Sequence, residues 1–162
     1  MIRRLTKPEY LCYLALAASS RAEDKHTRVG GVVVNKDWRV LSTAFNGVKS
    51  GQEVPKSWEL EENRNEKGEL IIHCENNLFN FIHDKPYAIG LTISPCFACS
   101  KMIVSHGIQE VYYISEYERD IEKKFKKVFD FYSVKYTQLT KENIRNILDF
   151  MAEDSNKLTR FL

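Results

Sequence analysis

Two short stretches decide the fold of this chain: His73-Cys74-Glu75 and Pro95-Cys96-Phe97-Ala98-Cys99. Together they supply one imidazole and two thiols, which suit a borderline-soft metal such as zinc, and a carboxylate two residues from the imidazole. Structural zinc sites normally close with four protein ligands, whereas catalytic sites use three and leave the fourth position to water. Three ligands beside an acid therefore predict a catalytic zinc site, and the chain must fold so that the two stretches meet.

The residues around these stretches alternate between helical and strand patterns. A helix that starts near Leu70 is expected to carry His73 and Glu75, and an apolar strand follows at residues 87–94. Pro95 is placed to open the next helix, whose first turn is expected to hold both cysteines on one face. The dipole and amide groups at a helix N-terminus favour thiolate over thiol, so this position prepares the cysteines for a metal.

The rest of the chain completes an alternating pattern. A capping box at Thr6-Lys7-Pro8-Glu9 predicts a helix that runs to about residue 23, and β-branched runs predict a hairpin of strands at residues 29–34 and 39–45. Trp58 is the only large anchor in the polar segment that follows. After the second cysteine we expect further elements, which are a strand at residues 111–114, a helix at 120–131, an edge strand at 133–137 and a helix at 140–151.

This order of elements predicts an α/β protein, a three-layer α/β/α sandwich around a mixed sheet of about five strands. We expect one domain over residues 1–162, with an irregular insert at residues 46–69. Residues 118–162 carry less diagnostic sequence. Such a sheet would place the helix ends that bear His73 and Cys96 side by side.

Composition narrows the class of protein. A chain of 162 residues with 43% hydrophobic and 28% charged residues fits one globular domain. The net charge of +2 lacks the strongly basic character of proteins that bind nucleic acid through many phosphates, so a nucleic-acid partner is not expected. The segment that begins Met1-Ile2-Arg3-Arg4 contains no hydrophobic run typical of a signal peptide or membrane span, which predicts a soluble, cytoplasmic protein.

The four cysteines divide into two kinds. Cys96 and Cys99 form Cys-x-x-Cys near a candidate histidine ligand, which favours metal-bound thiolates over disulfides. Cys12 and Cys74 are expected to be buried thiols.

The chemistry of the two stretches matches a known signature. His-x-Glu followed by Pro-Cys-x-x-Cys is the pattern of zinc deaminases, in which the glutamate is not a ligand. Zinc bound by His73, Cys96 and Cys99 would lower the pKa of its water to about 7. Glu75 could then carry protons from the water to a ring nitrogen and to the departing ammonia. A structural zinc site is the simpler alternative, but the presence of both His-x-Glu and Pro-Cys-x-x-Cys in the expected order favours a catalytic zinc site.

A resemblance to deoxycytidylate (dCMP) deaminases extends beyond the zinc motif and covers about residues 9–117. Five segments of this chain are similar to family segments, which are Arg-Ser-x-Asp, Val-Gly-Ala, Gly-Tyr-Asn-Gly-x-Pro-x-Gly, His-Ala-Glu-x-Asn-Ala and Gly-Ile-x-x-Val. The counterparts are Arg21-Ala22-Glu23-Asp24, Val29-Gly30-Gly31, Ala44-Phe45-Asn46-Gly47-Val48-Lys49-Ser50-Gly51, His73-Cys74-Glu75-Asn76-Asn77 and Gly107-Ile108-Gln109-Glu110-Val111.

The resemblance implies hydrolysis of dCMP to dUMP, which feeds thymidylate synthesis, with one catalytic zinc, a small deoxynucleotide substrate and a homo-oligomeric assembly. It also implies roles for residues outside the zinc motif. Asn46 would contact the sugar, Thr92 and Ser94 would line the base pocket, Arg21 and Arg28 would lie near the phosphate, and Tyr113 and Tyr117 would flank the base or phosphate. Buried or rim aromatics explain the two tyrosines equally well.

Two other functions remain open from the sequence. The same chemistry could act on a base held in tRNA or single-stranded DNA, which would need that base exposed in the same pocket. The modest net charge and the nucleotide-type segments count against this. The chain could also be a catalytically silent zinc-binding regulatory module, and the intact Glu75 argues against that.

Overall fold

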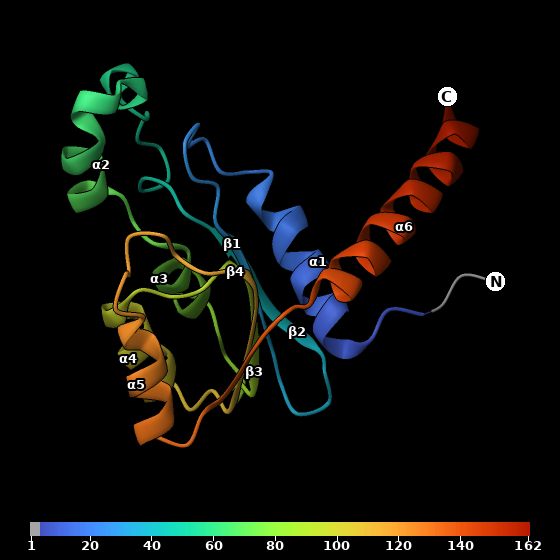
Figure 1. Ribbon diagram of the computed structural model, residues 1–162. Helices are drawn as coiled ribbons and strands as arrows, with labels where there is room; N and C mark the ends of the chain where they lie inside the picture. Colours follow the sequence, from blue (N-terminus) through green and yellow to red (C-terminus); the bar gives the residue numbers. More distant parts are fainter. Residues whose placement is uncertain (1–3) are drawn as a thin grey trace.

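A computed structural model describes residues 4–162 and has a five-stranded mixed sheet at its centre (Figure 1). The strand order is β2-β1-β3-β4-β5. The strands are β1 (Gly30–Val34), β2 (Val40–Phe45), β3 (Ala88–Ile93), β4 (Glu110–Ser115) and β5 (Lys135–Gln138). β1 pairs antiparallel with β2 and β3, whereas β3, β4 and β5 run parallel to one another. The carboxyl ends of β3 and β4 therefore lie at the same edge of the sheet.

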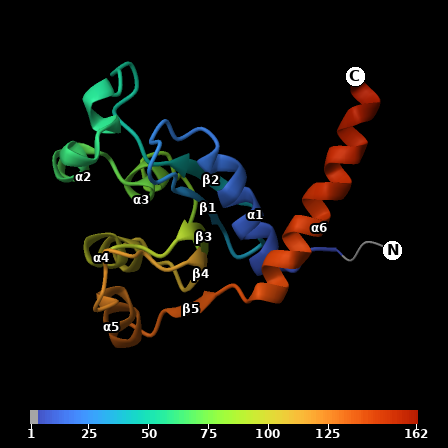
Figure 2. The same cartoon turned by 45° about the horizontal axis from the view of Figure 1, so that its top comes forward.

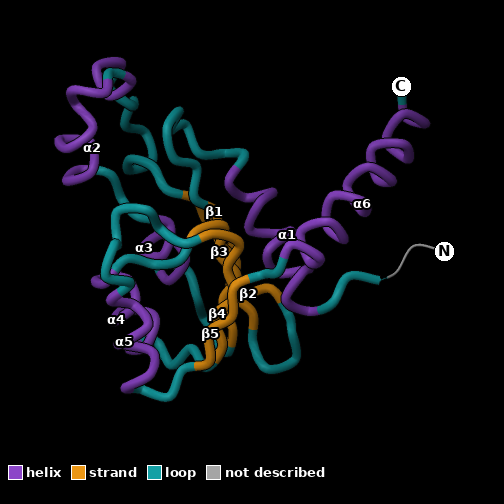
Figure 3. Tube along the Cα trace, in the orientation of Figure 1, coloured by secondary structure: helices purple, strands orange, loops and turns teal. Residues whose placement is uncertain are grey.

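Helices cover both faces of this sheet, with the strands as the central layer (Figure 3). One face carries α1 (Lys7–Ser19) and the first part of α6 (Lys141–Leu158), and the other carries α3 (Cys74–Phe79), α4 (Phe97–Ser105) and α5 (Lys124–Phe131). The predicted three-layer α/β/α sandwich with a five-stranded mixed sheet is confirmed. A short helix, α2 (Arg64–Leu70), and three 3-10 turns, Lys56–Glu59, Glu61–Asn63 and Thr159–Phe161, complete the elements.

The alternation of strand side chains divides the core into two clusters. Val32 and Val34 of β1 pack with Leu11 of α1, whereas Val33 between them packs with Leu78 of α3. Period-two alternation sends successive side chains to opposite faces, so each strand contributes to both clusters. Gly30 lies against the backbone of α1 with no room for a Cβ atom, which allows helix and sheet to approach closely.

The largest difference from the predicted elements lies just before the histidine. The helix expected from Leu70 is two helices, α2 and α3, separated by extended residues. Ile72 exchanges backbone hydrogen bonds with Gly47, at 2.8 and 3.1 Å, and a residue paired in this way cannot continue a helix. His73 is consequently the N-cap of α3 rather than a residue inside a helix.

Several other boundaries also shift. The first helix ends at Ser19 instead of residue 23, and the helix expected at 120–131 begins at Lys124, whose backbone N–H donates to Asp120. The last helix has the expected Thr140 cap but continues to Leu158. The segment 46–69, expected to be irregular, contains two 3-10 turns and most of α2, with Trp58 buried as its anchor.

The N-terminal expectation lies largely outside the described residues, because Met1, Ile2 and Arg3 of Met1-Ile2-Arg3-Arg4 precede residue 4. No helix in the described part of the chain combines the length and hydropathy that a bilayer span requires.

Candidate zinc centre and its cavity

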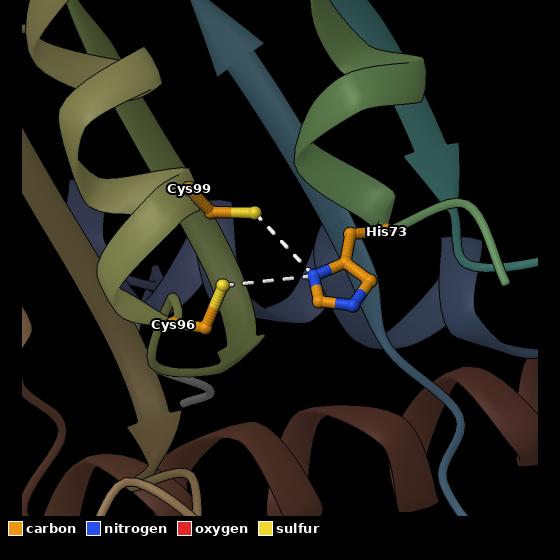
Figure 4. Close-up of side chains that lie close together, drawn as sticks. All are labelled: His73, Cys96 and Cys99. Atoms are coloured by element: carbon orange, nitrogen blue, oxygen red, sulfur yellow. Dashed lines mark hydrogen bonds between the residues drawn. The ribbon is translucent and has the colours of Figure 1, made fainter. Parts of the chain in front are cut away.

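The two sequence stretches meet where two helices begin. His73 caps α3, and Cys96 caps α4, with Cys99 in the first turn of α4 (Figure 4). His73 Nδ1 lies 3.7 Å from Cys96 Sγ and 3.4 Å from Cys99 Sγ. These three ligand atoms all lie within 4.8 Å of one another. The convergence predicted from the order of elements is therefore confirmed, although Cys96 precedes the first helical turn instead of lying inside it.

The separations fit a zinc ion. Tetrahedral ligands at about 2.3 Å for sulfur and about 2.1 Å for nitrogen place the sulfur and nitrogen atoms about 3.6 Å apart. The two measured distances lie on either side of this value. One imidazole and two thiols from rigid helix starts thus form a zinc-binding group with three protein ligands.

Backbone and side-chain hydrogen bonds attach the start of α3, which follows His73, to the end of β2. Cys74, fully buried, donates its thiol hydrogen to the carbonyl of Ala44 at 3.2 Å, and Asn77 donates its amide to the carbonyl of Phe45 at 3.0 Å. These bonds and the Gly47–Ile72 bridge tie the start of α3 to the end of β2 and the segment after it. The buried thiol expected of Cys74 is confirmed.

The electrostatics of the three ligands already favour a thiolate. Hydrogen bonds donated to its sulfur by the Cys99 thiol and by the His73 imidazole lower the pKa of Cys96 to about 4. The same bond to Cys96 raises the pKa of Cys99, because the pair shares its proton. The hydrogen bond to Cys96 raises the pKa of His73 above its ordinary value. A thiolate is the form that binds metal, so the site is prepared for a cation.

Glu75 lies beside this group in the first turn of α3, and only 4% of its surface is exposed. Burial raises the pKa of the Glu75 carboxyl, while hydrogen bonds to its own backbone and to Cys99 partly offset that shift. A buried carboxyl with a raised pKa can both accept and return a proton near neutral pH.

A cavity of about 360 Å³ opens onto the zinc-binding group. His73, Glu75 and Cys96 form part of its lining. The other polar and charged lining residues come from loops and from α2, and they are Asp24, His26, Thr27, Arg28, Asn46, Arg64, Lys67, Ser94, Glu116, Tyr117, Glu118 and Arg119. The cavity therefore has a zinc half and a second, polar half.

The match to known proteins agrees with this geometry. The family model described as the cytidine and deoxycytidylate deaminase zinc-binding region matches residues 5–115. The chain belongs to the cytidine and deoxycytidylate deaminase family. The deoxycytidylate deaminase of Mycobacterium phage D29 is 32% identical over 124 residues, covering 67% of this chain and 94% of the relative. The deoxycytidylate deaminase of Mus musculus is 25% identical over 156 residues, covering 91% and 88%.

A solved structure carries the likeness into three dimensions. The crystal structure of dCMP deaminase from the cyanophage S-TIM5, in complex with dCMP and dUMP, matches with a TM-score of 0.66 and 26% identity. The match covers 84% of this chain and all of the other. The predicted family and the predicted zinc cofactor are thus confirmed.

Four of the residues predicted to bind substrate line the cavity: Arg28, Asn46, Ser94 and Tyr117. Asn46 accepts a hydrogen bond from the Val29 amide at 2.8 Å and donates to the Thr27 carbonyl at 2.9 Å. The Ser94 hydroxyl accepts a hydrogen bond from the Tyr117 amide at 2.9 Å. These residues therefore shape the polar half as well as face it.

The other three predicted residues lie outside the lining. Arg21 is exposed beyond the end of α1, because the helix ends at Ser19. The Thr92 hydroxyl accepts a hydrogen bond from the Gly30 amide at 3.0 Å and so joins β3 to β1. Tyr113 is buried in the core, with its ring edge to face with Phe125 at 5.7 Å. The buried explanation holds for Tyr113, whereas Tyr117 lines the cavity and its substrate role stays a prediction.

Sequence reasoning missed several charged residues of the polar half, namely Asp24, Arg64, Lys67 and Arg119. Only Asp24 could have been found from the sequence, because it lies in the segment Arg21-Ala22-Glu23-Asp24, which resembles a segment of the family. The other three lie in charge-rich stretches where a residue that faces a cavity cannot be distinguished from one that faces solvent.

Proposed function

We propose that this protein hydrolyses dCMP to dUMP and ammonia. The observation that carries the proposal is the buried Glu75 beside the zinc-binding group, in a cavity open to a small ligand. Relatives and a structural neighbour named as deoxycytidylate or dCMP deaminases support the same substrate.

The zinc half would supply the chemistry. His73, Cys96 and Cys99 would hold a zinc ion, which would act as a Lewis acid and make water nucleophilic near neutral pH. Glu75 takes the protons of the attacking water on a carboxylate oxygen, gives one to ring nitrogen N3 and one to the departing amino group. The bond from the water oxygen to C4 forms and the bond from C4 to the amino nitrogen breaks, so one water is consumed and one ammonia released.

The polar half would hold the nucleotide. Asn46 uses one N–H and one lone pair for backbone groups, and the amide carries a second of each for the sugar. Ser94 and Tyr117 line the cavity and would lie beside the base. Thr92 and Tyr113 do not line the cavity, so they would support its wall without contacting the nucleotide. Arg21 would influence the phosphate only through long-range electrostatic attraction.

The phosphate would lie near the cationic rim. Lys67 is paired with Asp24 at 2.9 Å, and Arg64 is paired with Glu61 at 2.9 Å. Within residues 4–162, Arg28 and Arg119 form no ion pair, so their guanidinium groups are the rim cations best placed to meet an anion. The homo-oligomeric state and the cytoplasmic location stay predictions.

The test is an ammonia-release or absorbance assay of the zinc-loaded protein with dCMP, CMP, dCTP, deoxycytidine and a tRNA or oligonucleotide. We expect turnover of dCMP, its loss on chelation and its recovery on addition of zinc. Turnover of the oligonucleotide but not of dCMP would overturn the substrate assignment. Inactivity on every substrate with zinc bound would favour the silent regulatory module.

A further inference from the structure

We propose that the buried ion pair between Lys67 and Asp24 is a positioning latch that holds α2 against the cavity and thereby sets the affinity for substrate. The inference rests on the proposed function, because substrate affinity is its main readout. It assigns a role to two residues that form no hydrogen bond or ion pair with the zinc ligands or Glu75 in the described structure.

The position of Lys67 is unusual for the segment in which it lies. It is the only buried residue of α2, with 7% of its surface exposed, whereas most of the surrounding turns and helix face solvent. Its Nζ lies 2.9 Å from Asp24 Oδ1, and the two side chains are 8% and 4% exposed. Lysine is seldom buried unless it is paired. Within the insert, α2 is therefore attached through a charged side chain, whereas the turns before it are anchored by the buried Trp58.

Asp24 holds the conformation of the loop that carries the cavity-lining residues His26, Thr27 and Arg28. The same oxygen that meets Lys67 accepts hydrogen bonds from the backbone amides of His26 at 2.8 Å and Thr27 at 3.1 Å. Burial alone would raise the pKa of Asp24, but the hydrogen bonds from Lys67, Thr27 and His26 lower it below its ordinary value. The carboxylate thus stays ionised and joins α2 to the loop that carries Arg28.

Further contacts join the loop and α2 to other residues of the polar half. Asn46 binds the next part of the loop through the Thr27 carbonyl and the Val29 amide. α2 also meets Arg119, whose guanidinium lies 3.5 Å from the place a Cβ atom would take on Gly68. Lys67 and Asp24 therefore join α2, which contacts Arg119, to the loop that carries Arg28, and both arginines line the cavity.

The zinc half depends on different contacts. α3 and α4 rest on apolar core residues, and the Gly47–Ile72 bridge holds the chain just before His73. Loss of the latch should therefore loosen the insert and the rim without moving the zinc ligands. This separation predicts an effect on KM rather than on kcat.

A second ion pair offers a matched control. Lys25 Nζ lies 2.7 Å from Glu59 Oε2 and joins the same loop to the same insert, but its side chains are 61% and 48% exposed. Surface pairs of this kind contribute little because water screens them. Neither Lys25 nor Glu59 lines the catalytic cavity.

The experiment compares Asp24→Asn, Lys67→Met and the double variant with Lys25→Met and Glu59→Gln, all zinc-loaded. We expect each latch variant to raise KM for dCMP about tenfold or more, with kcat within about threefold and zinc content unchanged. The double variant should cost no more than the worse single variant, because the pair acts as one unit. Amide hydrogen exchange over residues 56–70, which hold the turns before α2 and α2 itself, should accelerate in the latch variants and stay unchanged in the controls, whereas the Gly47 and Ile72 amides should stay protected in all variants.

Unchanged KM in the latch variants, an equal rise in the surface-pair variants, or a loss confined to kcat would overturn the proposal. Asp24→Asn retains a side-chain oxygen for the two loop amides, so it tests the charge if Lys67→Met fails to fold. Failure of the wild-type protein to deaminate dCMP would refute the proposed function instead. The hydrogen-exchange comparison would still decide whether the pair holds α2.

Discussion

The zinc half and the polar half of the cavity are built in different ways. The zinc ligands come from the first residues of two helices that rest on fully buried side chains, including Leu78 of α3 and Ile103 of α4. The polar half comes from loops and from α2, joined to the body by hydrogen bonds and the Lys67–Asp24 pair. α2 and its turns lie at one end of the molecule, away from α6 at the other (Figures 1 and 2).

The two halves are suited to different tasks, which are to hold a metal ion and to admit a substrate. A metal centre requires ligand atoms held to a fraction of an ångström, and close-packed apolar cores supply that rigidity. A substrate wall must admit and release a ligand, and segments held by few polar contacts open at lower free energy. The two halves should consequently respond to mutation in different kinetic constants.

The largest effect is expected in the zinc half. Glu75→Gln removes the proton carrier but keeps the size and most of the polarity of the side chain. We expect kcat to fall by about 10²- to 10⁴-fold, the range typical of general acid–base groups, while bound zinc remains at the wild-type level. Steady-state kinetics with dCMP and metal analysis measure both quantities.

Glu69→Gln is the matched control, because Glu69 is exposed and lies four residues before His73. It should retain wild-type kinetics. Wild-type activity in zinc-loaded Glu75→Gln would show that another group carries the protons.

An intermediate effect is expected at the rim of the polar half. Arg28→Gln or Arg119→Gln should raise KM for dCMP by about tenfold or more, because a charge-assisted hydrogen bond is worth roughly 1.5–3 kcal/mol. The turnover of deoxycytidine, which has no phosphate, should change little. Kinetics on the two substrates measure this contrast.

Arg145→Gln, exposed on α6, controls for the general loss of positive charge. Equal losses on dCMP and deoxycytidine would mean that these arginines support the fold of the rim and do not read the phosphate.

The smallest effect on catalysis is expected on the far side of the sheet, at Glu9. Its carboxylate accepts hydrogen bonds from Asn143 at 2.9 Å and Asn146 at 2.8 Å, which attach α6 to α1. Glu9→Ala should lower the free energy of unfolding by about 1–3 kcal/mol, because buried polar groups lose their partners. Urea unfolding measures the loss, and KM and kcat should remain unchanged.

The contribution of Glu9 to the free energy of unfolding should depend on pH. Burial alone would raise the pKa of Glu9, but the bonds from Asn143, Asn146 and Thr6 lower it to about 2 from an ordinary value of 4.5. A lowered folded-state pKa means that the contribution is complete above pH 4.5 and is lost as the pH falls toward 2. The difference between wild type and Glu9→Ala should shrink over that range, whereas the exposed control Glu142→Ala should show no such change.

Particular residues show how far the sequence could predict the site. His73, Glu75, Cys96 and Cys99 were identified because the chemistry requires those residue types at short, fixed spacings along the chain. The start of α3 was misplaced, because the hydrogen bonds between Ile72 and Gly47 join residues far apart in sequence. Periodicity over a local window contains no information about such a partner.

The substrate wall was predicted less well for the same reason. Arg28 was identified with Arg21, yet only Arg28 reaches the cavity, since the early end of α1 leaves Arg21 outside. Arg119 and Lys67 were not identified, because their importance depends on Gly68 and Asp24, which the fold brings beside them.

The alternating elements, the zinc-binding group and the carboxylate beside it could thus be predicted from the sequence, because each depends on residues close together in the chain. The tertiary structure alone decided which charges face the cavity, which tyrosine lies in the core and how α2 is attached. Those features depend on contacts between distant segments, and the physical reason is that burial and pairing of a charge are properties of its surroundings rather than of the residue.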